Sequence, residues 1–244
     1  MSDWSAGYGL LELDSIDSTN AEARRRAIKG ARGPLWITAK SQTAGRGRRG
    51  NRWQSLEGNL FASLLLHPNK PAGECAQLTF AAALAVSDML AGYAPSGGFA
   101  LKWPNDVLAE GRKIAGILLE SESGADGKAA WLVIGFGVNL AAYPERLPAI
   151  SLAALGISPP TGKQAVHRLA GAFRKWYELW LEEGFAPVRE AWLARAAGLG
   201  ARLRVRLPRE EIEGVFLGID DNGALQLGLP GESTRAITAG EVFF

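Results

Sequence analysis

Apolar positions along the first part of the chain follow two different spacings. Short apolar or alternating runs typical of β-strands occupy residues 10–13, 35–40, 60–66, 99–103, 106–109, 113–121 and 131–139. Longer helical stretches occupy residues 19–28, which begin at a capping box of Thr19 and Glu22, and residues 76–93, which are alanine-rich and mostly apolar. A helix that is apolar all round must be enclosed by other elements. These patterns therefore predict a β-sheet with packed helices.

The rest of the chain changes character twice. Helical spacing over residues 162–183 and 186–197, interrupted at Gly184, predicts two further helices. Later alternating segments with turn signals between them predict a small β-barrel, with strands at residues 202–207, 213–219, 224–227 and 233–238. The predicted fold class is α+β, with a mixed-sheet domain at residues 1–197 and a β-barrel domain at residues 198–244.

The composition is that of an ordinary globular protein. Of 244 residues, 47% are hydrophobic and 21% are charged, and the formal net charge is only +2, so we expect no nucleic-acid partner. Cys75 is the single cysteine, which excludes an intrachain disulfide and favours a reducing compartment. Neither a continuous apolar run long enough to cross a bilayer nor the regions of a signal peptide are evident. We therefore expect a cytoplasmic protein without a membrane partner.

Residues 42–50 carry the most distinctive local chemistry, because three arginines are interspersed with three glycines after a predicted strand. Glycines let backbone N–H groups approach a ligand closely, and guanidinium groups match phosphate or carboxylate oxygens. Gly45, Gly47 and Gly50 satisfy the pattern G-x-G-x-x-G, but the helix and the later acidic residue of a dinucleotide site are missing. An arginine-rich RNA-binding module is a more distant alternative, because such stretches are usually longer. We call residues 42–50 the Gly/Arg loop.

A second cluster follows at residues 102–106, with the sequence Lys-Trp-Pro-Asn-Asp. It combines a compact cation, a turn and a carboxylate of the kind that binds Mg²⁺. Together with the Gly/Arg loop, it indicates nucleotide chemistry on a carboxylate. His67 and His167 are the only histidines, and neither belongs to a metal-ligand or Ser/His pattern.

The order of these blocks resembles the biotin protein ligases. The blocks are Ser-Thr-Asn at residues 18–20, the Gly/Arg loop with Trp53, residues 102–106, Lys-Ile-Ala-Gly-Ile-Leu at residues 113–118 and Gly-Phe-Gly-Val-Asn at residues 135–139. One departure is that Asn51 precedes Arg52, where family members often carry a base directly after the last loop glycine. The resemblance implies a catalytic domain of the class II synthetase-like, biotin ligase type and a C-terminal SH3-like barrel.

The resemblance implies a reaction in two steps. Biotin and MgATP give biotinyl-5′-AMP and pyrophosphate, and the ε-amine of a lysine on a biotin carboxyl carrier domain then displaces AMP. Biotin and ATP would be substrates and Mg²⁺ the cofactor. A lipoate or octanoate ligase or transferase of related fold is the nearest alternative. The resemblance also implies a form without an N-terminal DNA-binding domain, and it allows a homodimer.

The resemblance assigns roles to individual residues. The ureido ring of biotin would be bound by Ser18, Thr19, Asn20 and Gln42, although the first three would serve equally to cap a helix. Further biotin contacts would come from Gly45, Arg46, Gly47, Arg48, Lys113 and Gly116. Contacts to ATP or the adenylate would come from Arg46, Arg48, Arg49, Trp53, Lys102 and Asn139.

Lys102 is the expected principal catalytic residue, because it would bridge the reacting carboxylate and the α-phosphate. Arg48 is the second expected catalytic cation. Trp53 would stack on adenine, and Asn139 would recognise an edge of the same base. Asp106 is the candidate Mg²⁺ ligand.

Overall fold

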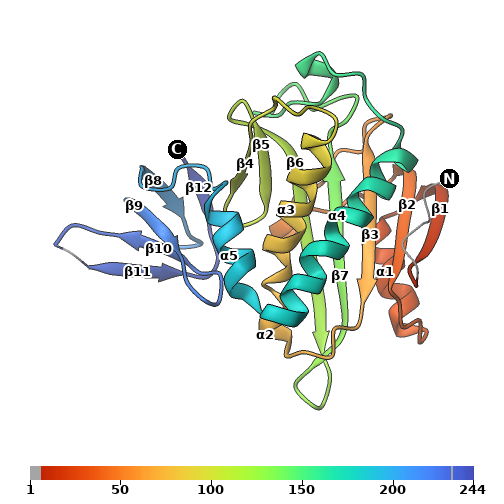
Figure 1. The fold of residues 1–244 in the computed structure, drawn as a ribbon, viewed down its shortest axis with the longest axis horizontal. Helices are drawn as coiled ribbons and strands as arrows, with labels where there is room; N and C mark the ends of the chain where they lie inside the picture. The colour runs from red at the N-terminus through yellow and green to blue at the C-terminus, as the bar shows by residue number, and fades with distance from the viewer. Residues whose placement is uncertain (1–6, 232) are drawn as a thin grey trace.

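The structure is a computed structural model, and it describes residues 7–231 and 233–244. Figure 1 shows two sheets that lie side by side. The larger sheet has seven strands in the order β1-β2-β3-β7-β6-β5-β4, and the smaller has five in the order β11-β10-β9-β8-β12. In the larger sheet β1 and β2 are parallel and the other neighbours are antiparallel. The predicted α+β class with a mixed sheet is therefore confirmed.

The elements have the following bounds. The strands of the larger sheet are β1 (Gly9–Ile16), β2 (Leu35–Gln42), β3 (Leu60–Leu66), β4 (Phe99–Lys102), β5 (Asp106–Ala109), β6 (Arg112–Ser123) and β7 (Ala129–Val138). The strands of the smaller sheet are β8 (Arg202–Arg206), β9 (Glu211–Ile219), β10 (Leu225–Gly228), β11 (Thr234–Ile237) and β12 (Glu241–Phe243). The α-helices are α1 (Thr19–Ile28), α2 (Ala72–Cys75), α3 (Leu78–Ala91), α4 (Gly162–Glu183) and α5 (Phe185–Leu193), and short 3₁₀ helices lie at Arg48–Gly50 and Ala153–Leu155.

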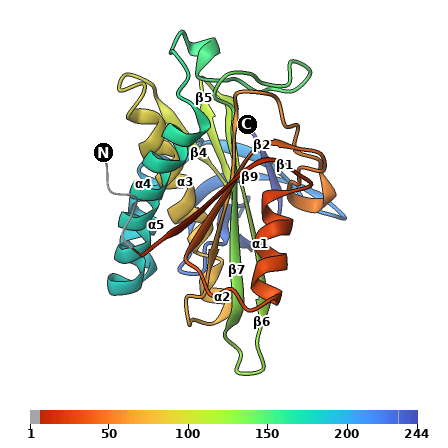
Figure 2. The ribbon, with the colours of Figure 1, turned by 90° about the vertical axis from the view of Figure 1, so that its right-hand side faces the viewer.

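Helices cover both faces of the larger sheet. In Figure 2, α3 and α4 lie on one face and α1 lies on the other. Leu78, Leu84 and Leu90 of α3 are completely buried, as the apolar sequence of this helix requires. Each such side chain stabilises the fold by about 1.5 to 3 kcal/mol relative to an exposed one. The main core therefore lies between the sheet and α3.

The buried helices also bear on the expected absence of a membrane span. Residues 72–91 are long and apolar enough to cross a bilayer by length and composition alone, but 67% of their most apolar window is buried inside the protein. Such burial is what the core helix of a globular domain shows.

The predicted capping box at the start of α1 is wrong. Ser18, not Thr19, is the N-cap residue, and its Oγ accepts a hydrogen bond from Ala21 N at 3.4 Å. The carboxylate of Glu22 binds two arginines further along the helix instead of the cap backbone. Because Thr19 does not cap the helix, its hydroxyl can donate a hydrogen bond to Gln42 Oε1 instead.

Two further predictions needed correction. The helix expected at residues 76–93 corresponds to α3 at residues 78–91, and the short helix α2 that precedes it at residues 72–75 was not predicted. The final strand β12 was not predicted, although it completes the smaller sheet. Within the described residues, β11 and β12 form the two edges of that sheet, so its strand pairing is open rather than that of a closed barrel.

Strand β4 is linked to the segment between α5 and β8, and the residue after it is linked to the turn between β9 and β10. Leu101 N donates a hydrogen bond to Arg195 O, and Ala197 N donates one to Leu101 O, both at 2.8 Å. The buried indole N–H of Trp103 donates to Gly223 O at 3.0 Å. The turn that follows β4 is therefore anchored to the C-terminal part of the chain.

Candidate active site

A cavity of about 550 Å³ lies beside the N-terminal end of α1. It is bounded by the start of α1, the Gly/Arg loop, residues 102–106, strands β6 and β7, residues 144–149 and residues 240–244. Its volume is in the range of small-molecule sites, roughly 300 to 1,000 Å³. Every residue predicted for the site lines this cavity except Gly45. The sequence blocks that are far apart along the chain thus converge on one space.

Glycines clear the floor of the cavity. Along β7, alternate residues face α1, and the row changes from the bulky Trp131 and Val133, which pack in the cluster beneath α1, to Gly135 and Gly137. A Cβ at Gly135 would overlap the Asn20 side chain, and a Cβ at Gly137 would overlap the indole of Trp53. These two glycines therefore create the room in which the cavity forms.

The neighbouring strand continues this floor. Gly116 of β6 pairs directly with Gly137. A Cβ at Gly116 would lie 3.0 Å from Lys113 Nζ and 3.1 Å from the Trp53 ring. The absence of side chains at Gly116 and Gly137 lets the Trp53 ring approach two adjacent strands closely. Lys113 Nζ lies 5.6 Å from the centre of the Trp53 ring.

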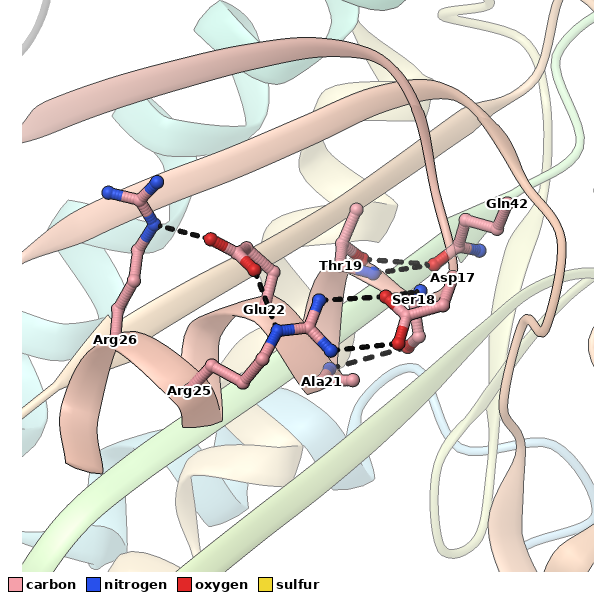
Figure 3. Close-up of polar contacts among 8 residues, drawn as sticks. All are labelled: Asp17, Ser18, Thr19, Ala21, Glu22, Arg25, Arg26 and Gln42. Carbon is pink, nitrogen blue, oxygen red and sulfur yellow. Dashed lines mark hydrogen bonds and ion pairs between the residues drawn. The ribbon is translucent and has the colours of Figure 1, made fainter. Parts of the chain in front are cut away.

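A network of neutral polar groups lies at the start of α1. Figure 3 shows the Gln42 side chain against Thr19, whose backbone N–H and hydroxyl donate to Gln42 Oε1 at 2.9 and 3.2 Å. Ser63, which is fully buried, donates from Oγ to Thr19 Oγ1 at 2.8 Å and to Asn20 Oδ1 at 2.5 Å, two alternatives for its one hydroxyl proton. Ser18, Thr19 and Asn20 are all buried. Their polar atoms are therefore held in fixed directions rather than solvated.

Ion pairs between side chains stabilise the outer side of the start of α1. The Arg25 guanidinium binds both carboxylate oxygens of Asp17 at 2.8 Å, and its Nε also binds Glu22 (Figure 3). The hydrogen bond from Arg25 lowers the pKa of Asp17 to about 2. The arrangement ties the residue before the N-cap to the second turn of the helix. It thereby stabilises the segment that presents the buried polar residues.

The Gly/Arg loop folds back on itself as a short hairpin. Gly47 N donates to Asn51 O at 2.7 Å and Trp53 N donates to Gly45 O at 3.0 Å, and Arg46 and Arg52 form an isolated bridge. A Cβ at Gly45 would lie 2.6 Å from the Trp53 carbonyl oxygen, so Gly45 serves the closure of the loop rather than the lining of the cavity.

Two further arginines of this hairpin have different positions. Arg52, which follows the position where the sequence departs from the family pattern, donates to Thr43 O and fixes the base of the loop. Arg49 is one of the residues that line the cavity. Its backbone has a positive φ of 55°.

Two arginines of the loop reach polar partners on other elements. Arg46 Nη2 lies 2.8 Å from Glu120 Oε1, and the other oxygen of Glu120 accepts from Asn20 Nδ2 at 2.9 Å. Arg48 Nη1 donates to Asn105 Oδ1 at 3.0 Å. Arg46 therefore lies near the neutral polar network, whereas Arg48 lies near the turn at residues 102–106.

Cations and carboxylates meet at the opposite end of the cavity. Lys102 is half-buried, and burial lowers the pKa of its ammonium, while the carboxylates of Asp106 and Glu241 oppose that change. Burial likewise lowers the pKa of Arg48. Lys113 Nζ lies 2.6 Å from Asp106 Oδ1 and forms an ion pair with it. This end of the cavity thus concentrates positive charge in a partly desolvated space, where charges interact more strongly than in water.

Asn139 and Trp53 occupy different situations. The Asn139 amide lies in the wall of the cavity but donates to Ile150 O at 3.1 Å and to Lys113 O at 3.5 Å. Its side chain therefore joins β6 to the loop after β7, and its predicted contact with adenine stays a prediction. Trp53 Nε1 is buried and has no hydrogen-bond partner among the described residues.

The side chains present fit a metal ion that is held mainly by substrate. Within the described part of the chain, no group of three or more His, Cys, Asp and Glu side chains is placed to hold a metal. Asp106 and Glu241 are the two carboxylates in the described lining. Mg²⁺ commonly uses one or two carboxylates with substrate phosphates and water, so this donor set fits a nucleotide-bound Mg²⁺.

Several residues of the site were not predicted. Glu120 and Ser63 have no motif of their own, and their roles appear only when the strand pairing places them beside α1. Asn105 was quoted within the Lys-Trp-Pro-Asn-Asp block but given no role, although it links Arg48 to Ile117 O. Glycines at alternate positions of β7 were the one usable signal, because they clear a single face of a strand.

Comparison with known proteins gives a consistent result. Residues 12–139 match the model of the biotin/lipoate A/B protein ligase family, and residues 198–244 match that of the biotin protein ligase C terminal domain. The chain is 44% identical to a biotin–[acetyl-CoA-carboxylase] ligase of Paracoccus denitrificans, over 95% of this chain and 99% of that protein. It is 34% identical to the bifunctional ligase/repressor BirA of Bacillus subtilis, over 91% of this chain and 70% of that protein. A solved biotin protein ligase of Aquifex aeolicus, in complex with biotin and ATP, superposes with a TM-score of 0.81 at 26% identity, covering 96% of this chain and 97% of the other.

Proposed function

This chain belongs to the biotin protein ligase family, and from that membership together with the cavity we propose that it is an ATP-dependent biotin protein ligase. It activates biotin as biotinyl-5′-AMP and transfers the biotinyl group to a lysine of a biotin carboxyl carrier domain. The observation that carries this proposal is the convergence of Arg48 and Lys102 on one cavity whose other end is neutral and polar.

The first step places two anions in contact. An oxygen of the biotin carboxylate attacks the α-phosphorus of ATP, a new P–O bond forms, and the bond to pyrophosphate breaks. Lys102 and Arg48 reduce the repulsion between carboxylate and phosphate and stabilise the charge that develops on the phosphoryl oxygens. A well-placed donor of this kind lowers a barrier by about 3 to 4 kcal/mol. Both side chains are partly buried, which strengthens the effect.

The neutral end of the cavity suits the ureido ring of biotin. That ring has one carbonyl acceptor and two N–H donors, and the network of Ser18, Thr19, Asn20, Gln42 and Ser63 supplies both kinds of partner. The hydrocarbon chain of lipoate or octanoate forms no hydrogen bonds with such groups. If that chain covered polar groups of the protein without pairing them, the loss of hydration would cost free energy. The geometry therefore favours biotin over the lipoate or octanoate alternative.

The second step uses the same cations on a different bond. The neutral ε-amine of the carrier lysine attacks the acyl carbon, the C–O bond to AMP breaks, and the amine loses its extra proton to form an amide. Lys102 stabilises the departing phosphate, so its contribution extends to both steps. Mg²⁺ supplies charge neutralisation for the phosphates when bound, and Asp106 is the side chain that we assign to it.

Finer features complete the proposal. We assign the biotin contacts to Arg46, Lys113 and the floor glycine Gly116, and we assign adenine stacking to Trp53. The division into a catalytic domain at residues 1–197 and an SH3-like domain at residues 198–244 is likewise proposed. So are a cytoplasmic location, the absence of a nucleic-acid or membrane partner, and a homodimer as an allowed assembly.

The test is a transfer assay. The purified protein is incubated with biotin, MgATP and a biotin carboxyl carrier domain, and the mass of the carrier is measured; lipoate replaces biotin in a parallel reaction. We expect the carrier mass to increase by one biotinyl group in the reaction with biotin and to stay unchanged in the reaction with lipoate. Lys102→Ala should abolish biotinyl-AMP formation, whereas Lys163→Ala, which removes an exposed lysine paired with Glu12, should not. Lipoyl transfer without biotinyl transfer would refute the assignment.

A further inference from the structure

Two aromatic rings lie beside the lysine at the centre of the proposed chemistry. The Nζ atom of Lys102 is 5.6 Å from the ring centroid of Phe243 and 5.6 Å from that of Phe244. Both distances are within the range at which an ammonium ion is attracted to an aromatic face, about 6 Å. Phe243 belongs to β12 and Phe244 follows it, whereas Lys102 ends β4 of the other sheet. The contact therefore joins the two sheets at the cavity.

The Phe243 ring is itself fixed from the side of the smaller sheet. Residue Phe243 pairs with Arg204 across β12 and β8. The guanidinium groups of Arg204 and Arg206 lie 5.2 and 4.6 Å from its ring centroid, and Arg206 Nε is held by Glu211 at 2.6 Å. These cations surround the Phe243 ring and favour its present position. In this position the Phe243 ring is a neighbour of the Lys102 ammonium.

The Phe244 ring is placed differently. It lies against Gly198, where a Cβ would overlap its ring atoms. Phe244 is 61% exposed, so burial of apolar surface contributes little to holding it there. Its residue nevertheless lines the cavity and faces the ammonium of Lys102. The contact with a cation is the interaction that distinguishes this position from an ordinary exposed phenylalanine.

The residues on both sides of Lys102 show the same connection. Leu101 exchanges backbone hydrogen bonds with Arg195 and Ala197, and Trp103 binds Gly223 O through its indole N–H. Leu101 is thus bound to the segment that leads into the smaller sheet, while Lys102 and Trp103 reach the end of that sheet and its β9–β10 turn. Of the three, only Lys102 makes its contact through a charged group that must also reach the substrates. Free lysine side chains populate many rotamers, and restricting them in advance removes an entropic cost from the reaction.

We propose that Phe243 and Phe244 are positioning residues for adenylation: their rings form a bracket that holds the Lys102 ammonium at the cavity before ATP binds. The proposal rests on the role of Lys102 in the proposed function. Neither ring touches the reacting atoms, so both act through Lys102. The C-terminal part of the chain then contributes to the first chemical step and not only to the stability of the fold.

The experiment compares variants of the full chain. Phe244→Leu and the double variant Phe243→Leu/Phe244→Leu keep apolar bulk but lose the aromatic faces, and Phe244→Tyr keeps the face. Leu217→Ala is the matched control, because Leu217 is 55% exposed in β9 and lies outside the catalytic cavity. Pyrophosphate release is measured against ATP and against biotin, with the melting temperature of each variant as a measure of folding.

A contact of this kind accounts for about a two- to fivefold effect per ring. We expect kcat/KM for ATP to fall two- to fivefold in Phe244→Leu and about tenfold in the double variant, with the KM for biotin unchanged and Phe244→Tyr within twofold of wild type. Normal ATP kinetics in both leucine variants, or an equal loss in Leu217→Ala, would overturn the proposal. A wild-type protein that forms no biotinyl-AMP would instead refute the function itself. A folding defect in the double variant leaves Phe244→Leu, at an exposed position, to decide.

Discussion

Replacing Gly135 by alanine provides a sharp test of how the cavity recognises the ring of biotin. Gly135 faces the side chain of Asn20, and the added methyl group would overlap it, so Asn20 must move. Its present position provides hydrogen bonds with Glu120 at 2.9 Å and with Ser63 at 2.5 Å, and a longer one with Leu118 O. Gly135 is not at a positive φ, so the backbone itself accepts alanine. The perturbation is therefore steric and confined to the neutral end.

The magnitude follows from the hydrogen bonds that Asn20 makes in its present position. An ordinary hydrogen bond contributes about 1 kcal/mol and one to a charged group about 1.5 to 3 kcal/mol, so displacement of the Asn20 amide should cost about 2 to 3 kcal/mol. If that whole cost appears in biotin binding, the KM for biotin should rise by about thirtyfold to somewhat over a hundredfold, because about 1.4 kcal/mol corresponds to a factor of ten. The KM for ATP should change less than twofold, because Lys102 and Arg48 lie at the opposite end. The melting temperature should fall by roughly 4 to 12 °C, from about 2 to 4 °C per kcal/mol for a chain of this size.

The assay is pyrophosphate release with biotin varied at saturating ATP, and then with ATP varied. Gly171→Ala is the matched control, because a Cβ there meets nothing within 4 Å and the residue lies inside α4. That control should raise stability by about 0.5 to 1 kcal/mol and leave both KM values unchanged. A folded Gly135→Ala protein with a normal KM for biotin would refute the assignment of this end of the cavity to the ureido ring.

Three further outcomes are expected. Arg48→Ala should release biotinyl-AMP about tenfold or more faster than wild type, because the variant lacks one charge-assisted hydrogen bond to the phosphate; an unchanged release rate, measured by rapid dilution, would contradict this. Asp17→Asn should lower the free energy of unfolding by about 0.2 to 1 kcal/mol at pH 7, because the ion pair with Arg25 is largely solvent-exposed. Since the pKa of Asp17 is depressed to about 2 from its usual 3.8, that difference should persist above pH 3.8 and disappear as the pH falls through 2, as followed by urea unfolding. Burial raises the pKa of Cys75 to about 11, so its thiol should react with a disulfide reagent at least a hundredfold more slowly than a free thiol at pH 8 until the protein is denatured.

The sequence predicted the elements of this fold better than their ends. The apolar run of residues 60–66 has the same bounds as β3, because a strand buried on both faces is recognisable in a sequence as a continuous hydrophobic run. The expected range of residues 19–28 matches α1, but its N-cap was assigned to Thr19 instead of Ser18, because both residue types are good N-caps and the contact of Thr19 with Gln42 is not visible in the sequence. β12 was missed because a strand of three residues has no recognisable alternation and depends on pairing with β8.

The same limit applies to the candidate site. Arginines, lysines and glycines in dense motifs could be nominated from their chemistry and from the family resemblance, and all of them except Gly45 line one cavity. Glu120, Ser63 and the two phenylalanines of the bracket could not, because their significance lies in which residues face them across the sheet or between sheets. Asn139 illustrates the converse, since its motif suggested a ligand contact while its amide binds Ile150 O within the protein.

The cavity has one end lined by neutral polar groups and another that carries cations, and this order explains the course of the proposed reaction. A neutral ring is recognised best by fixed, directional hydrogen bonds, and the start of α1 provides them through buried groups such as Thr19 and Ser63. Phosphates are recognised by charge, which Arg48 and Lys102 provide at the far end. A molecule with a neutral ring at one end and a carboxylate at the other can satisfy both only in one orientation. That orientation carries the carboxylate to the cations where the α-phosphate lies, so recognition of the ring positions the acid for attack.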